Sequence, residues 1–283
     1  MPEQSPQPGW GTQYRLVASE KWRMQSAYMG QAVTEALVEY ARPSEGMRVL
    51  DLASGTGEPA ISLALRVGDR GHVTALDLSA ELLEIAAQRA EKRGLENFAT
   101  QQADAHTLPF PDEHFDLATS RFGVMFFSDP VAALTELRRV LRPGARVCFV
   151  AWGKFEQPYW QTTMGTVHNH VGGPLLQPDG PNPFRFAEPG SLSSVLRTAG
   201  FADVEEETRT VPWTWPGSAE DVWEQARSVA VPFRPMLDRV PADRWPQINA
   251  DVHAAINRYS HGDEIAFGAS VVLASGRKRQ AFS

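Results

Sequence analysis

The feature that most constrains the fold of this chain is a glycine-rich turn between an apolar run and a helix-forming stretch. The run Arg48–Leu52 predicts a strand, the turn A-S-G-T-G follows it, and a helix is expected to begin near Pro59. Gly55 and Gly57 permit close approach of a ligand to the backbone. The free N–H groups of the helix start can receive a carboxylate. A lone G-x-G-x-x-A turn is shared with nicotinamide and flavin enzymes, so it predicts a ligand site without naming the ligand.

Short β-rich runs alternate with helical stretches along the chain, which predicts a mostly parallel α/β sheet covered on both faces. Ser79 is expected to cap a helix that runs to about Lys92, and Asp129 to cap one that starts at Pro130. Another helix precedes the first strand and ends before Pro43. The expected strands are Arg48–Leu52, His72–Asp77, Phe98–Gln102, Phe115–Ser120, Ala145–Trp152, Ala202–Val211 and Phe267–Ser275, with a helix over Ser191–Thr198.

Acidic residues stand at the ends of three successive predicted strands. Asp51 lies where a carboxylate can pair with an ammonium, which a dinucleotide pyrophosphate does not offer; alternatively it accepts local backbone N–H groups. Asp77 can accept hydrogen bonds from both hydroxyls of an adenosine ribose, or serve the turn. Asp104 can accept a hydrogen bond from an adenine amine, or act as a turn residue. Together the three predict a nucleoside site along one sheet edge.

Five motifs carry a resemblance to a known family. They are LDLASGTGEPA from Leu50, ALDLS from Ala75, QADAHTLPF from Gln102, FDLATSRFGVMFF from Phe115 and ELRRVLRPGARV from Glu136. The series resembles the class I S-adenosylmethionine-dependent methyltransferases, and among them the branch similar to the ubiquinone/menaquinone C-methyltransferases. This resemblance spans roughly Arg48 to Trp152.

The resemblance implies a Rossmann-like, doubly wound seven-stranded sheet of order 3-2-1-4-5-7-6 whose last strand is antiparallel. It implies S-adenosylmethionine as cofactor and S-adenosylhomocysteine as product, with Asp51 close to the amino group and Asp77 on the ribose. Leu78 would flank the adenine, Asp104 and Ala105 would meet its edge, and Arg121 and Phe122 would close the site. The turn residues along the methionine part would be Ala53, Ser54, Gly55, Thr56 and Gly57.

After Trp152 the regular pattern lapses, and the segments Gly153–Glu188 and Ser218–Tyr259 match no pattern tied to one substrate. We interpret them as a helical, aromatic-rich cap over the carboxyl edge of the sheet, where open α/β proteins bind ligands. A small organic acceptor, aromatic or lipophilic, is expected there. His168 and His170 are candidates for a general base, although histidines in such a segment are more often surface residues. Trp22 is a candidate to lie over the cofactor.

We divide the chain into six parts. Residues 1–44 are an N-terminal tail and first helices, 45–152 the S-adenosylmethionine-binding core, and 153–188 a cap segment. Residues 189–217 return to the core as a helix and strand. Residues 218–262 form a helical cap insertion, and 263–283 the last core strand and C-terminal tail.

The composition and net charge of the chain limit the kinds of partner that it can be expected to bind. A net charge of −7 disfavours nucleic acid. The basic run Arg277–Arg279 is interpreted as a solvated chain end.

Cys148 lies in an apolar run, and no apolar stretch of the sequence is long enough to cross a bilayer, so a cytoplasmic protein is expected. No metal-ligand spacing is present. The acceptor atom and oligomeric state stay open, as do two alternatives: a nicotinamide-dependent oxidoreductase and a non-catalytic nucleoside-binding module.

Overall fold

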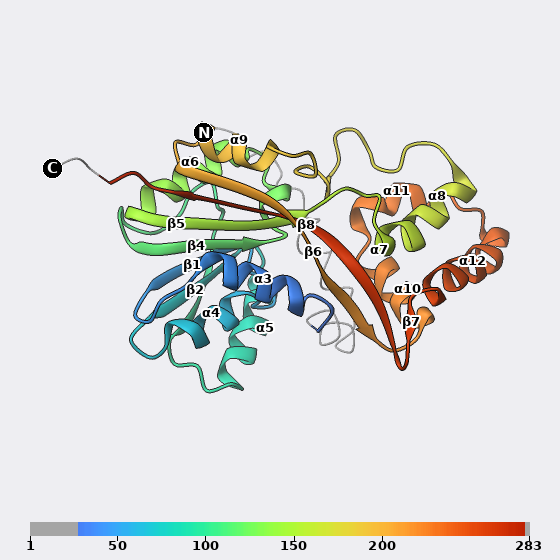
Figure 1. Cartoon of the computed structure of the whole chain (residues 1–283), viewed down its shortest axis with the longest axis horizontal. Helices are drawn as coiled ribbons and strands as arrows, with labels where there is room; N and C mark the ends of the chain where they lie inside the picture. The colour runs from blue at the N-terminus through green and yellow to red at the C-terminus, as the bar shows by residue number, and fades with distance from the viewer. Residues whose placement is uncertain (1–27, 281–283) are drawn as a thin grey trace.

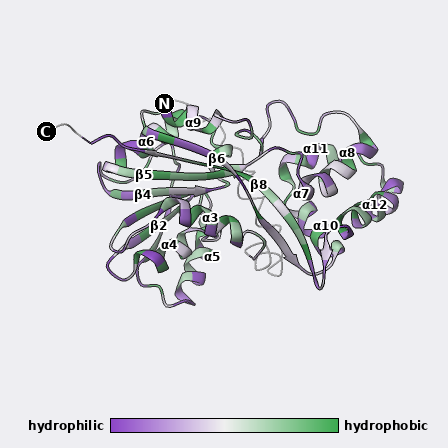
Figure 2. Cartoon of the chain, viewed as in Figure 1, coloured by the Kyte–Doolittle hydropathy of each residue, from purple (hydrophilic) through white to green (hydrophobic). Residues whose placement is uncertain are grey.

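The central strands are buried because their sequences are almost entirely apolar. In β1 (Arg48–Leu52) only Arg48 is partly exposed, and in β2 (His72–Asp77) only the two end residues are. In β4 (Phe115–Arg121) every residue except Asp116 and Arg121 is buried, and the later part of β5 (Leu141–Trp152) is apolar (Figure 2) and buried. The structure, a computed structural model, describes residues 28–280.

One sheet organises the described residues. Its strands run in the order β3-β2-β1-β4-β5-β8-β6, which confirms the expected order 3-2-1-4-5-7-6 because β8 takes the place of the seventh strand. Strands β1 to β5 pair in parallel. β8 is antiparallel to both β5 and β6. The remaining strands are β3 (Phe98–Gln102), β6 (Ala202–Pro216), β8 (Glu264–Arg277) and the extra β7 (Ser260–His261), which pairs with β8.

Helices cover both faces of the sheet. Figure 1 shows α6 and α9 on the opposite side of β5 from α3. Two predicted caps are confirmed: the Ser79 hydroxyl accepts from the N–H of Leu82 at 3.2 Å, and the Asp129 carboxylate accepts from the N–H of Ala132 at 2.9 Å. The helices of the core are α3 (Gln31–Ala41), α4 (Ala60–Val67), α5 (Ala80–Glu91), α6 (Pro130–Val140) and α9 (Ser191–Thr198), with a 3₁₀ turn η1 (Val124–Phe126).

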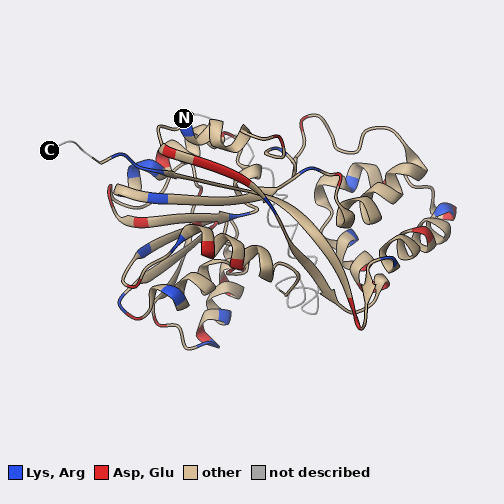
Figure 3. Ribbon diagram, viewed as in Figure 1, with Lys and Arg blue, Asp and Glu red and all other residues tan. Residues whose placement is uncertain are grey.

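Beyond the sheet, β6 and β8 continue as a long antiparallel pair of strands with helices packed beside it (Figure 1). Charged residues are sparse along the extended part of the two strands, except at its far end (Figure 3). The helical pieces are α7 (Pro158–Trp160), the π-helical η2 (Gln161–Gly165), α8 (Thr166–Val171), α10 (Ala219–Ser228), η3 (Val231–Phe233), α11 (Arg234–Leu237), η4 (Ala242–Arg244) and α12 (Trp245–Asn257). We call this extension of β6 and β8, together with its helices, the cap.

The expected limits of the last strands were too short. β6 ends at Pro216 rather than Val211, and β8 spans Glu264–Arg277. The extension follows a period of two: Val211, Trp213 and Trp215 are buried while the residues between them are more exposed. Such alternation is the signature of a strand with one buried face. The segment after Gly153, expected to be irregular, is helical over residues 158–171.

Candidate functional site

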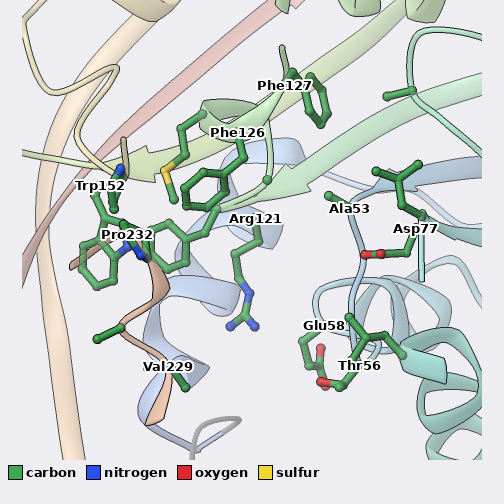
Figure 4. A pocket seen from close by; sticks show the side chains of 18 of the residues that line it. Ala53, Thr56, Glu58, Asp77, Arg121, Phe126, Phe127, Trp152, Val229 and Pro232 are labelled. Atoms are coloured by element: carbon green, nitrogen blue, oxygen red, sulfur yellow. The ribbon is translucent and has the colours of Figure 1, made fainter. Parts of the chain in front are cut away.

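A cavity of about 330 Å³ opens at the carboxyl ends of the parallel strands and continues under the cap. Figure 4 shows Asp77 and Thr56 on one side of it, Trp152 and Pro232 on the other, and Arg121 between them. The cavity therefore has a polar end beside the glycine turn and an aromatic end beside the cap.

The turn after β1 has an unusual backbone conformation, with positive φ at two glycines and at one residue that is not glycine. Gly55 and Gly57 have φ of 55° and 106°, and Ala53, which lines the cavity, has φ of 52°. A Cβ on Gly57 would come within 3.3 Å of the Cα of Ala86, so glycine there also lets α4 and α5 approach. Positive φ at a residue other than glycine costs energy and clusters at binding sites.

Asp51 is fully buried at the end of β1. One carboxylate oxygen, Oδ1, accepts a hydrogen bond from the Thr119 hydroxyl at 2.7 Å, whereas Oδ2 is buried with no hydrogen-bond partner within residues 28–280. Burial raises the pKa of Asp51 to about 7, although the hydroxyls of Ser54 and Thr119 act in the opposite direction. A buried carboxylate with an unpaired oxygen fits an ammonium group, which would supply the missing positive charge.

Asp77, at the end of β2, lines the cavity and also holds the turn. Its Oδ2 accepts from the N–H of Gly55 at 2.8 Å and its Oδ1 from the N–H of Ser79 at 3.0 Å. The turn role that the sequence left open is thus present. Each carboxylate oxygen has a second lone pair, so both can accept from ligand hydroxyls as well. Leu78 next to it is 51% exposed and lines the cavity.

Asp104 and Ala105 follow β3 and line the same polar end. The Asp104 carboxylate accepts from the N–H of His106 at 2.9 Å and lies 2.6 Å from its ring nitrogen Nδ1. Burial alone would raise the pKa of Asp104, but these hydrogen bonds outweigh it and lower the pKa. The other ring nitrogen of His106 lies 3.1 Å from the carbonyl oxygen of Asp129, so the histidine links this carboxylate to the start of α6.

Arg121 and Phe122 lie between the two ends of the cavity. Arg121 donates to the carbonyl of Gly30 at 3.1 Å and to the Thr34 hydroxyl at 3.0 Å, which ties the end of β4 to the first turn of α3. Phe122 has φ of 57° and stacks on Trp152, with ring centroids 4.3 Å apart and planes 9° apart. These two residues separate the polar end from the aromatic end.

The aromatic end is built from β5, β6 and the cap helices. Trp152 contacts the edges of Trp160 and Trp213 at centroid distances of 5.3 and 4.9 Å. The Tyr159 hydroxyl donates to the Gln225 side-chain oxygen at 3.1 Å. All five residues line the cavity. The wall is apolar and mostly aromatic.

The structure brings most of the expected cofactor residues to the cavity, but not all. Asp51, Ser54, Gly55 and Gly57 lie behind its surface and shape the turn. The residues that line it are Ala53, Thr56, Asp77, Leu78, Asp104, Ala105, Arg121 and Phe122.

His168 and His170 do not line the cavity. The Nε2 of His168 lies 2.8 Å from the carbonyl oxygen of Gly173. The Nε2 of His170 lies 2.9 Å from the carboxylate of Asp251. Their placement gives no support to a role as general base. The candidate Trp22 lies outside the described residues.

Several lining residues were not singled out from the sequence. Arg89 donates to the backbone oxygen of Thr56 at 2.9 Å, which fixes the turn from α5. Glu58 directly follows the G-x-G turn, and His106 stands two residues after Asp104, so their positions beside recognised motifs were the available signal. Gln225 comes from the cap helix α10, where no motif marks it.

Two kinds of feature are missing from residues 28–280. No group of three or more His, Cys, Asp and Glu side chains there could hold a metal ion. Nor does any helix in that part of the chain have the length and apolar character needed to span a membrane.

Sequence comparison gives a family match. A family model described as "ubiE/COQ5 methyltransferase family" matches residues 29–171. The ubiquinone/menaquinone biosynthesis C-methyltransferase UbiE of Shewanella frigidimarina is 40% identical over 111 residues, which cover 39% of this chain and 44% of that protein. The chain therefore matches less than half the length of this relative.

Solved structures share the fold over a longer stretch. The YcgJ protein from Bacillus subtilis has a TM-score of 0.56 at 25% identity, covering 88% of this chain and 98% of that one. A putative methyltransferase from Bacillus halodurans has a TM-score of 0.57 at 21% identity, covering 87% of this chain and 99% of that one. The Rossmann-like sheet is common to all three.

Proposed function

Because this chain belongs to the ubiE/COQ5 methyltransferase family, we propose that it transfers the methyl group of S-adenosylmethionine to a small organic acceptor, aromatic or lipophilic. The observation that carries the proposal is the buried carboxylate of Asp51 with its unpaired oxygen, set behind the glycine turn of a nucleoside-sized cavity. An amino-acid ammonium satisfies this carboxylate, whereas a dinucleotide has no ammonium to offer.

The polar end of the cavity takes the cofactor. Asp51 pairs with the ammonium, and the turn from Ala53 to Gly57 lies along the methionine part. Asp77 accepts from the ribose hydroxyls, and Leu78 flanks the adenine. Asp104 and Ala105 meet the adenine edge. These assignments are supported by the common cavity that the side chains of these residues line or stand behind.

The sulfonium of the bound cofactor supplies an activated methyl group. The protein's own contribution is positioning and exclusion of water. Arg121 and Phe122 stand where the two ends of the cavity meet, and the stacked ring of Trp152 continues the wall toward the acceptor. These residues hold the acceptor in line with the methyl group.

Part of the acceptor end lies beyond the stretch that the family model matches, although Trp152, Tyr159 and Trp160 lie within it. Trp213, Gln225 and Phe233 line the cavity but lie beyond residues 29–171. The relative named above is a ubiquinone/menaquinone biosynthesis enzyme, and the family model ends at residue 171, before these residues. The acceptor is accordingly an aromatic or lipophilic molecule selected by the cap.

Transfer of a labelled methyl group tests the proposal. The protein is incubated with S-adenosylmethionine labelled in its methyl group and with a panel of phenols and hydroxylated polycyclic aromatics. We expect label in an organic-extractable product with the native protein and almost none with Asp51→Asn, which removes the counter-charge of the ammonium. A protein that neither transfers label nor binds S-adenosylhomocysteine would contradict the proposed function.

A further inference from the structure

Charge divides the wall of the cavity into two halves. The charged lining residues are Glu58, Asp77, Arg89, Asp104, His106 and Arg121; the first five belong to the polar end, and Arg121 stands where the two ends meet. The lining residues from Trp152 onward include no charged side chain. A charged acceptor in this half would lose its hydration without gaining a counter-ion, which is costly. The occupant of this half is therefore uncharged.

The surfaces in this half are largely aromatic. Phe122 and Trp152 form a parallel stack, and the rings of Trp160 and Trp213 stand nearly perpendicular to Trp152, at 81° and 76°. Aromatic rings favour further stacked or edge-to-face partners. A planar, aromatic occupant can therefore add contacts of both kinds to this wall.

Two hydrogen-bond donors in the same wall lack partners. Trp160 and Trp213 are each 8% exposed and line the cavity. Within residues 28–280 their indole nitrogens are buried without a hydrogen-bond partner. The indole nitrogen of Trp223, away from the cavity, instead donates to the side-chain oxygen of Asn249 at 2.8 Å. Buried donors in proteins are nearly always paired, so two unpaired ones in one cavity wall require an explanation.

We propose that the indole N–H groups of Trp160 and Trp213 donate hydrogen bonds to oxygen atoms of the methyl acceptor. The substrate class that follows is an uncharged, planar molecule with carbonyl or ether oxygens. Trp160 and Trp213 are then the specificity-determining residues of the acceptor end. This inference rests on the proposed function, because it takes the occupant of the aromatic end to be the acceptor.

A matched pair of probes isolates the hydrogen bond. Fluorenone and fluorene are both planar, uncharged and of nearly equal size, and differ in that a carbonyl replaces a methylene group. Equilibrium dialysis at saturating S-adenosylhomocysteine gives the affinity of the protein for each. The ratio of the two affinities reports on donors in the wall, and differences in water solubility cancel when the ratio is compared between variants.

The variants remove the donors and keep the rings. We expect the fluorenone-to-fluorene ratio to fall about tenfold in the double variant Trp160→Phe, Trp213→Phe, the amount one or two hydrogen bonds to a neutral group contribute. Trp223→Phe is the matched control, because it removes a paired donor outside the cavity. In this control the ratio is expected to stay at the wild-type value.

An unchanged ratio in a double variant that still binds S-adenosylhomocysteine would overturn the inference. If phenylalanine disturbs the wall so that cofactor affinity is lost, Trp160 and Trp213 are replaced by benzothienylalanine, which keeps the bicyclic shape and carries sulfur in place of N–H. The same fall in the ratio is then expected. Failure of the native protein to bind S-adenosylhomocysteine would instead contradict the proposed function, so the two failures are distinguishable.

Discussion

The carboxylate of Asp77 accepts a hydrogen bond from the backbone N–H of Gly55 at 2.8 Å. This bond joins the end of β2 to the glycine turn after β1, although the two residues belong to different βα units. Its other oxygen accepts from Ser79, the cap of α5. Asp77 thus shapes the turn on which the cofactor is proposed to lie, besides facing the cavity itself.

Asp77→Ala is expected to weaken S-adenosylhomocysteine binding by more than the loss of the ribose contact alone would. It removes charge-assisted hydrogen bonds, at roughly 1.5–3 kcal/mol each, and frees the N–H of Gly55. Asp77→Asn retains one oxygen and should lose less. Calorimetric titration measures both, with Asp69→Ala as an exposed control away from the cavity. Equal affinity in native protein and folded Asp77→Ala would remove Asp77 from the site.

The affinity for S-adenosylhomocysteine should depend on pH through Asp51. Burial raises the pKa of this carboxyl to about 7 in the free protein, and only the ionised form attracts an ammonium. Below that pH binding must expel a proton, so affinity is expected to fall by up to about tenfold for each further pH unit. Titrations from about pH 5 to about pH 8 check this. Asp51→Asn should bind weakly with a flat profile; a sloping profile in that variant would point to another group.

The same burial predicts an effect on stability. The pKa of Asp51 in the folded protein lies above its value of 3.8 in the unfolded chain. The contribution of Asp51 to the free energy of unfolding is therefore present at acid pH and is lost as the pH rises to about 7. Asp51→Asn removes the buried charge. Its unfolding free energy relative to the native protein should therefore increase with pH, by up to about 4 kcal/mol between about pH 4 and about pH 8. Urea unfolding at both ends measures the difference; a difference independent of pH would be inconsistent with a buried, titrating Asp51.

His106 is expected to act on the adenine end through Asp104. Its ring nitrogen lies 2.6 Å from that carboxylate, and His106→Ala removes this contact while the backbone N–H of residue 106 still donates to the carboxylate. We expect S-adenosylhomocysteine affinity to drop by about 1 kcal/mol, the size of a single hydrogen bond. S-inosylhomocysteine, which lacks the adenine amine, should bind the variant and the native protein almost equally. His261→Ala, on exposed β7, is the control. An equal loss for both ligands would mean that His106 is structural.

The local part of the fold was predictable from the sequence. The first three strands have the limits that their apolar runs predict, and Ser79 and Asp129 cap the helices as expected. In these units each apolar run is bounded by turn or cap residues close in sequence. Asp51, Asp77 and Asp104 could be found for the same reason, since each stands at or near the end of its own strand.

The residues of the acceptor end could not be predicted from the sequence in the same way. Tyr159, Trp213 and Gln225 meet only because β6 and β8 extend beyond the sheet and fold the cap over it. The spacing of residues in the sequence does not reveal that these three side chains lie together, because their contact depends on long-range packing. His168 and His170 were candidates by residue type alone, and their rings contact Gly173 and Asp251 instead.

Calorimetric titration of the native protein with S-adenosylhomocysteine and, separately, with NAD tests the central claim most directly. The unpaired oxygen of Asp51 and the carboxylate of Asp77 predict binding of S-adenosylhomocysteine with a single site per chain and no measurable binding of NAD. Binding of NAD with no heat from S-adenosylhomocysteine would contradict the account and place the cavity with the dinucleotide enzymes.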